Sequence, residues 1–309
     1  MGLRGQDDLR RMSHSTSTLD RFGLTIVAAL EALCYPLIFM GASSAPHLTF
    51  AALRALVAGA VLAGVAIRFG RPIPREPRTW AYLALIGVGT ISFGYLGMFR
   101  GSEFVSPGMA TTITHVRPFI AALLAYPLLA ERPTSLQVIG LMLGFGGVLV
   151  IAIPPWVGGR STDFSLGFSY LVIAATGVAT GNVLTRKVAG NVDPIVATSA
   201  QCLFGFMPLS VAAVVVEDPL AVVWSYSFVG SRLGLALVGT ALVRCLLFVL
   251  RSRVPLHEGN AFTFLTPFIA LGYGALFFGE HIETSTFLGL LVAAFGILFV
   301  ESDSAHQRK

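Results

Sequence analysis

Charged residues are scarce in this sequence. Asp, Glu, Lys and Arg make up 12% of the 309 residues, against about 25% in an average soluble domain. Hydrophobic residues reach 55%, and the mean hydropathy is +0.77. This balance excludes a water-soluble globule. The net charge of +5 does not indicate a nucleic-acid partner, because the basic residues stand between apolar runs, where they set the orientation of a membrane protein.

Cysteines and catalytic motifs are scarce too. Cys34, Cys202 and Cys245 lie in apolar stretches and form no CxxC pair, so neither a disulfide framework nor a zinc site is supported. No apolar run contains an HExxH helix, paired carboxylates or a nucleophile beside a base. We therefore expect no metal and no enzymatic activity.

What the sequence does contain is ten apolar runs. They lie near 22–42, 48–67, 80–99, 108–130, 136–154, 166–185, 194–216, 232–250, 259–279 and 285–301. Each lasts about 20 residues without the period-2 alternation of a strand, and in hydrocarbon a helix bonds its own backbone groups. The sequence predicts an all-α membrane protein with ten transmembrane helices.

The basic residues fall mainly on one side of these runs. With a cytoplasmic N-terminus, inside segments hold 15 Lys and Arg residues, and outside segments hold Arg100, Arg160 and Arg232. The positive-inside rule then predicts that both termini are cytoplasmic, with flexible tails at 1–21 and 302–309. The alternative of a secretory signal cleaved near Gly41–Ala45 is disfavoured, because the first run is too long and contains Glu31.

Two further features favour a prokaryotic protein of the inner membrane. Arginine outnumbers lysine by 19 to 2, which is typical of a GC-rich genome, and no Asn-x-Ser/Thr acceptor for glycosylation occurs.

The second half of the chain repeats the first. The tetrad Pro-Phe-Ile-Ala at 118–121 recurs 149 residues later at 267–270, and Val-Gly-Thr at 88–90 recurs at 238–240. At the 149-residue separation Glu131 matches Glu280, Gly140 matches Gly289 and Gly147 matches Gly296. Because an odd number of crossings inverts the second copy, we expect two inverted five-helix repeats, at 22–154 and 166–301.

The segments 118–151 and 267–300 resemble the two EamA-type repeats of the drug/metabolite transporter superfamily. Both show Pro, then Ala-Glu or Gly-Glu, then Gly, and Arg54 matches the family's second-helix arginine. The resemblance covers residues 22–301. It implies transport of amino acids, other metabolites, nucleotide sugars or drugs, without a cofactor or nucleotide hydrolysis. It also implies a central cavity lined mainly by helices 1, 3, 4, 6, 8 and 9.

Four charged residues lie within the predicted spans: Glu31, Arg54, Arg117 and Arg244. A charge at the bilayer centre costs about 2.5–3.5 kcal/mol on insertion scales, so each is a functional hypothesis. Their sum is +2. Surplus positive charge in a cavity favours a bound anion, and a guanidinium suits a carboxylate. We expect Arg117 and Arg244 to bind an acidic substrate group, with Glu31 and His115 in the same site.

The role of Glu31 has two interpretations. It either pairs with an arginine and holds helices together, or carries a proton, with His115 as a second titrating group. Exchange against a counter-substrate is the other mode of coupling. Arg54 is expected to be a structural anchor, because the resemblance implies that helix 2 lies toward the periphery.

Glu131 and Glu280 each stand between two predicted helices, where a carboxylate can satisfy free amides at a helix N-terminus. The alternative is that each closes a gate through a basic partner. Pro118 and Pro267 interrupt the carbonyl ladders of their helices and provide hinges or substrate-binding carbonyls.

Asn182 and Asn260 are uncharged polar residues at the depth of the spans. They either hydrogen-bond between helices or bind the substrate.

The sequence predicts a secondary transporter in the lipid bilayer that exports a small metabolite, an amino acid or a related organic anion, by alternating access. It allows a monomer or a homodimer. A membrane-embedded enzyme is the first alternative. A channel or structural protein is the second, although a pore requires a ring of like residues.

Overall fold

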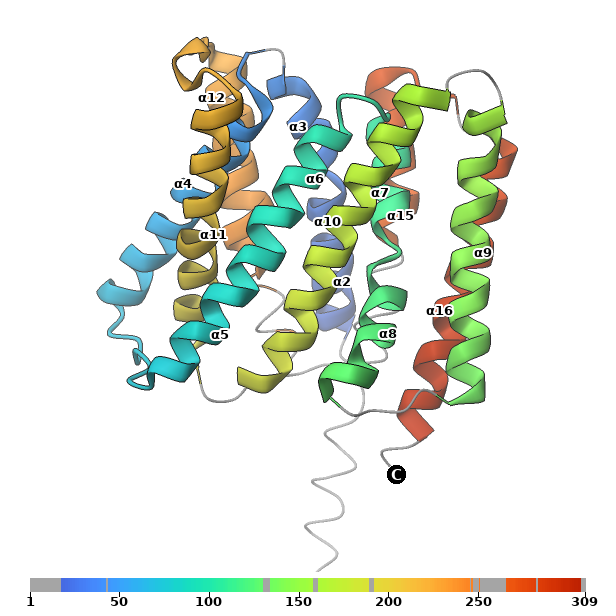
Figure 1. The fold of residues 1–309 in the computed structure, drawn as a ribbon, viewed down its shortest axis with the longest axis horizontal. Coiled ribbons are helices and arrows are strands. Elements are labelled where there is room, and N and C mark those ends of the chain that lie inside the picture. Colours follow the sequence, from blue (N-terminus) through green and yellow to red (C-terminus); the bar gives the residue numbers. More distant parts are fainter. Residues whose placement is uncertain are drawn as a thin grey trace, which may run out of the picture.

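The structure is a computed structural model that describes residues 18–42, 44–129, 134–157, 161–188, 192–244, 246, 250, 265–281 and 283–306. In these ranges all regular structure is helical, and no strand occurs among them. Figure 1 shows the helices running along a common direction in one bundle. The all-α class predicted from the sequence is confirmed.

The helices follow one another with short connections. The first half of the chain forms α2 (Thr18–Ala32), α3 (Cys34–Ala42), α4 (His47–Arg68), α5 (Pro77–Gly87), the π-helix η1 (Val88–Phe93), α6 (Gly94–Gly101), α7 (Pro107–Thr114), α8 (Arg117–Leu129) and α9 (Ser135–Val157). The second half forms α10 (Ser161–Val188), α11 (Pro194–Val216), the 3-10 turn η2 (Pro219–Ala221), α12 (Tyr226–Leu233), the π-helix η3 (Gly234–Leu242), α15 (Leu265–Phe278) and α16 (Thr284–His306).

The ends of the helical part differ from the predicted tails. The helix α2 begins at Thr18 rather than at 22, and Asp20 in its first turn complements the helix dipole. The helix α16 continues to His306, because no Gly or Pro interrupts the polar residues that follow its apolar part.

Five helical stretches of the described part are long and apolar enough to cross a membrane. They are Thr18–Gly41, His47–Arg68, Pro77–Gly101, Asp163–Thr185 and Pro194–Val216. Four shorter apolar helices, at 138–151, 228–242, 265–278 and 284–296, overlap other predicted runs. The protein is therefore a multi-pass membrane protein, while the count of ten crossings stays a prediction.

Helices α9 and α16 pack through glycines that match in the sequence repeat. A Cβ atom on Gly147 would lie 2.5 Å from the carbonyl oxygen of Gly289, and a Cβ atom on Gly296 would lie 2.5 Å from that of Gly140. Since residue numbers rise along one helix as they fall along the other, the two helices are antiparallel. Figure 1 shows them together at one edge of the bundle.

Helices α4 and α11 form a second antiparallel pair between the two halves. The hydroxyl of Ser199 donates to the carbonyl of Gly59 at 2.9 Å in the middle of the pair. At one end, Arg71 Nη1 lies 3.5 Å from Asp193 Oδ2. At the other end, the carboxylate of Glu217 accepts hydrogen bonds from the first turn of α4. The pair is thus tied along its whole length.

The two π-helices occupy equivalent places in the sequence repeat. The turn η1 includes Val-Gly-Thr at 88–90, and η3 includes the same tripeptide at 238–240. A π-turn carries an extra residue and often marks a functional site. In both halves it widens the third helix of the predicted repeat.

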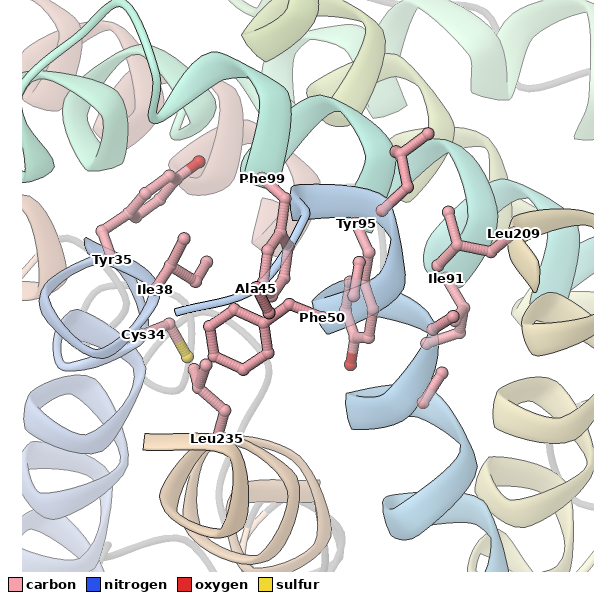
Figure 2. Packing of buried hydrophobic residues seen from close by; sticks show 14 of the residues in the cluster. Cys34, Tyr35, Ile38, Ala45, Phe50, Ile91, Tyr95, Phe99, Leu209 and Leu235 are labelled. Carbon is pink, nitrogen blue, oxygen red and sulfur yellow. The ribbon is translucent and has the colours of Figure 1, made fainter. Parts of the chain in front are cut away.

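Large aromatic side chains fill the core between α3, α4, α6 and α12. The ring of Phe50 meets those of Phe99 and Phe228 edge to face, with centroid distances of 5.0 and 5.1 Å. Figure 2 shows Phe50 and Phe99 in the same cluster as Cys34 of α3 and Leu235 of η3. This apolar cluster adjoins the polar groups described next.

Candidate functional site

Arg54 is the most buried charged residue of the described part. Its side chain is 3% exposed, although it lies on α4, which was expected at the periphery. One face of α4 is exposed, with Leu56 and Ile67 on it, whereas Arg54 lies on the face that packs against the core. Its Nε donates to Thr240 Oγ1 at 3.2 Å, and its Nη2 lies 3.6 Å from Cys34 Sγ.

Tyr95 covers one face of this guanidinium. The Cζ atom of Arg54 lies 4.3 Å from the centre of the Tyr95 ring, a cation–π contact. The hydroxyl of Tyr95 is also 3.1 Å from Thr240 Oγ1. We call Cys34, Arg54, Tyr95 and Thr240 the Arg54 cluster; it joins α3, α4, α6 and η3.

Arg117 lies where the fourth predicted span is broken. The helix α7 ends at Thr114, and α8 begins at Arg117, so His115 and Val116 form a non-helical step. Pro118 explains the break, because a proline has no N–H for the helix ladder and disfavours continuous helix in the turn before it. Such discontinuous helices expose backbone polar groups inside a membrane protein.

The imidazole of His115 contacts the Arg117 guanidinium. Arg117 Nη2 is 3.3 Å from His115 Nε2, and His115 Nδ1 is 2.7 Å from the carbonyl of Thr111. Because a guanidinium only donates and a carbonyl only accepts, these partners select the neutral tautomer with hydrogen on Nδ1. His115 is buried in this arrangement.

Helix α3 connects Arg117 to the Arg54 cluster. The Tyr35 hydroxyl donates to Thr114 Oγ1 at 3.3 Å, next to the break in α7–α8. Arg54 and Arg117 both lie near Cys34 and Tyr35 of this helix.

Glu31 and Arg244 approach the same centre from other helices. Glu31 and Arg117 lie near Cys34 of the Arg54 cluster. Arg244 lies near Tyr95 of that cluster and near Cys202. Within the described residues, no ion pair joins Glu31 to an arginine.

Glu280 lies at the end of the bundle, away from this region. It follows Gly279, whose φ of +64° turns the chain after α15. Its carboxylate accepts hydrogen bonds from Ser106 Oγ at 3.0 Å and from the amide of Gly108 at 3.2 Å. Burial raises the pKa of Glu280, although both hydrogen bonds act in the opposite direction. Among the described residues, its partners are helix-start donors and not a basic group.

The remaining predicted residues are distributed as follows. Pro267 is buried in the first turn of α15, and Asn182 is exposed on α10. Pro118 lies in the first turn of α8. Glu131 and Asn260 lie outside the described residues. Three His, Cys, Asp or Glu side chains do not gather as metal ligands anywhere in the described ranges.

One charged cluster was not predicted from the sequence. His47, Arg100, Glu103 and Glu217 meet at one end of the bundle, where Arg100 lies 2.8 Å from Glu103 and 3.7 Å from Glu217. His47 Nδ1 is 3.2 Å from Glu103. In the sequence, Pro46 was the available signal for this cluster. The side chain of a proline before α4 cannot cap the first amides of the helix, so another residue must supply the acceptor.

Fold and site together define a helical membrane transport protein, with polar and cationic groups buried at the centre of its bundle. The chain belongs to the EamA-like transporter family, whose profile matches residues 22–153 and again residues 165–302.

Named relatives agree with this assignment. An uncharacterized transporter of Synechocystis is 28% identical over 94% of this chain and 92% of its own. A chloroplastic WAT1-related protein of Arabidopsis thaliana is 30% identical over 81% of this chain, which spans 61% of the plant protein's length. A probable amino-acid metabolite efflux pump of Escherichia coli is 27% identical over 88% of this chain and 91% of its own.

A solved crystal structure has the same fold. It superposes with a TM-score of 0.66 at 17% identity, over 96% of this chain and the whole of the other chain. The protein is thus a membrane-embedded transporter of the EamA-like family.

Proposed function

We propose that the protein is a secondary transporter that exports a small metabolite with an acidic group, an amino acid or a related organic anion. The observation that carries this proposal is a set of three arginines: Arg54 in the Arg54 cluster, Arg117 near its Cys34 and Arg244 near its Tyr95. Within the described residues, no carboxylate lies within ion-pair distance of any of them.

Charge balance favours an anionic substrate. Glu31 brings one negative charge to the region, against three positive charges. Uncompensated charge in a low-dielectric interior is costly, and a substrate carboxylate would offset it. The probable amino-acid metabolite efflux pump among the relatives is compatible with a substrate of this class.

The broken helix α7–α8 supports a substrate site near Arg117. Transporters bind substrates near the bilayer midplane, where the N-terminus of a half-helix attracts an anionic group. Arg117 is the first residue of α8 and combines the positive end of that helix with its own charge. Arg244 would approach the substrate from the second half.

Alternating access is supported by the relation between the two halves. The two glycine contacts between the antiparallel helices α9 and α16 are equivalent to each other in the repeat, since Gly147 on Gly289 corresponds to Gly296 on Gly140, as inverted repeats would give. Two nearly equivalent packings then allow the centre to open to either side in turn. The positive-inside distribution supports an inner-membrane protein with cytoplasmic termini.

Glu31 is the stronger candidate for proton coupling. The hydrogen bonds of His115 fix a neutral imidazole beside a guanidinium, an arrangement that opposes a second positive charge. Glu31 lacks such a fixed partner among the described residues. Exchange against a counter-substrate needs no titrating group and is the competing mode.

Counterflow in vesicles containing the purified protein tests the proposal. Labelled acidic and neutral amino acids are offered outside, with unlabelled substrate inside. Arg117→Ala and Arg244→Ala should each lower uptake of acidic substrates at least tenfold, with little effect on neutral ones. The variant Arg75→Ala changes an exposed arginine and should behave as the wild type.

An equal loss for acidic and neutral substrates would contradict the anion preference. Uptake that does not accelerate in the presence of unlabelled substrate inside would contradict exchange by alternating access.

A further inference from the structure

The guanidinium of Arg54 has an edge without a protein partner. Thr240 accepts a hydrogen bond from Nε, Cys34 Sγ lies beside Nη2, and the Tyr95 ring covers one face of the guanidinium. Nη1 is fully buried and makes no hydrogen bond within the described residues. The side chains near Arg54 are those of Tyr95, Cys34 and Cys202, and none of them is a carboxylate.

A purely structural anchor would not leave these donors unused. An arginine has five N–H groups in a fixed plane, and a buried charged donor without an acceptor is costly. In membrane proteins such a residue pairs with an acid or with carbonyls. Arg54 instead contacts a hydroxyl, a thiol and an aromatic ring.

We infer that Arg54 binds the anionic group of the transported substrate through its Nη1 edge, with Thr240 and Tyr95 fixing the plane of the guanidinium. This inference rests on the proposed function and adds a residue to its site. A carboxylate fits that edge, because it can accept two parallel N–H bonds from one guanidinium.

The position of Arg54 between the two halves gives this contact a role in transport. Its own helix belongs to the first half, whereas Thr240 lies in η3 of the second. Arg244 acts on the same Tyr95 ring. A substrate bound to Arg54 would therefore be linked to both halves of the chain. A transporter requires such a link if substrate binding is to trigger the change of access.

The test uses the purified full chain in detergent and sodium acetate as the probe. Acetate is the smallest carboxylate, and acetamide is its neutral control. Thermal unfolding is followed as the concentration of each rises, because a ligand of the folded state raises the unfolding temperature. The variants are Arg54→Met, Arg54→Lys and Arg117→Met, with Arg75→Met as the matched exposed control.

We expect a saturable stabilisation of the wild type and of Arg75→Met by acetate and none by acetamide. Arg54→Met should need at least tenfold more acetate for half of the effect. Without acetate it should unfold at the wild-type temperature or above, since an apolar residue of similar size removes an uncompensated charge. Arg54→Lys keeps the charge but not the planar fork, and should also need at least tenfold more acetate.

A wild-type response of Arg54→Met or Arg54→Lys would overturn the inference, and so would the absence of any response in the wild type. If both variants failed to fold, Arg54 would be an anchor, and the inference would also fall. If only Arg117→Met lost the response, the proposed function would stand without Arg54. Counterflow of acidic substrates tests that function independently.

Discussion

Removing the carboxylate of Glu217 should destabilise the protein by about 2–3 kcal/mol. This carboxylate lies just after α11 and accepts hydrogen bonds from the amides of Leu48 and Thr49 at 3.0–3.1 Å, and from the Thr49 hydroxyl at 3.2 Å. It thus provides the N-terminal cap of α4 from 169 residues away. The residue before α4 is Pro46, whose side chain cannot replace it.

The magnitude follows from these contacts. Loss of an N-terminal cap costs about 0.5–2 kcal/mol, and hydrogen bonds to a charged group contribute about 1.5–3 kcal/mol. The side chain of Glu217 is only 8% exposed, so water would not replace the lost acceptor fully. Arg100, 26% exposed and 3.7 Å away, should add less than about 1 kcal/mol.

Reversible unfolding of the purified protein in mixed micelles, with a rising fraction of denaturing detergent, measures the effect. Glu217→Gln keeps one acceptor oxygen and should lose about 1 kcal/mol. Asp218→Ala removes the neighbouring exposed carboxylate, which accepts one hydrogen bond from the amide of Leu220 at 2.9 Å, and should lose about 0.5–1 kcal/mol. If Glu217→Ala lost no more stability than Asp218→Ala, the buried cap would contribute no more than an exposed one and the reasoning would be refuted.

Three further predictions use the same unfolding assay. Gly147→Ala should lose about 1–3 kcal/mol at the crossing of α9 and α16, whereas Gly146→Ala, next to open space, should lose nothing; equal effects would disprove the close contact. Ser92→Ala removes a 2.8 Å bond to the carbonyl of Gly205 and should cost about 1 kcal/mol, against less than about 0.5 kcal/mol for exposed Ser169→Ala. Since burial raises the pKa of Glu280, its favourable contribution is present at low pH and is lost as the pH rises through that raised pKa. Glu280→Gln should therefore gain stability relative to the wild type as the pH rises above about 4.3, the ordinary pKa of a glutamate, and parallel pH curves would contradict this.

The sequence predicts where the helices lie because hydrophobicity is a local property. Described helices fall in all ten predicted runs, with ends that differ by a few residues. Pro118 also indicates an interruption, but the break itself lies at His115 and Val116, because proline acts on the turn before it. The π-helices have no local signal beyond the repeated Val-Gly-Thr, since their wide turns depend on packing.

The centre of the site is less predictable than the helices. Charge and depth single out Glu31, Arg117 and Arg244 in the sequence, and their role in a substrate site stays a prediction. The position of Arg54 along its helix, however, does not show which face packs inward, so its burial was missed.

Contacts between distant loops are also hidden in the sequence. The cap formed by Glu217 and its pair with Arg100 depend on the meeting of α4, α6 and α11 at one end of the bundle. The sequence alone does not single out Thr240, whose place in the Arg54 cluster follows from its contacts with Arg54 and Tyr95.

The bond between Arg54 and Thr240 also constrains how the protein can be made. The two residues are 186 positions apart, so at about 5–20 residues per second the ribosome needs roughly 10 to 40 s to deliver the hydroxyl after the guanidinium. During that interval the growing chain contains Arg54 without its partner Thr240, in or beside the lipid. The first half of the chain synthesised alone should therefore insert poorly into the membrane and be degraded readily by quality-control proteases.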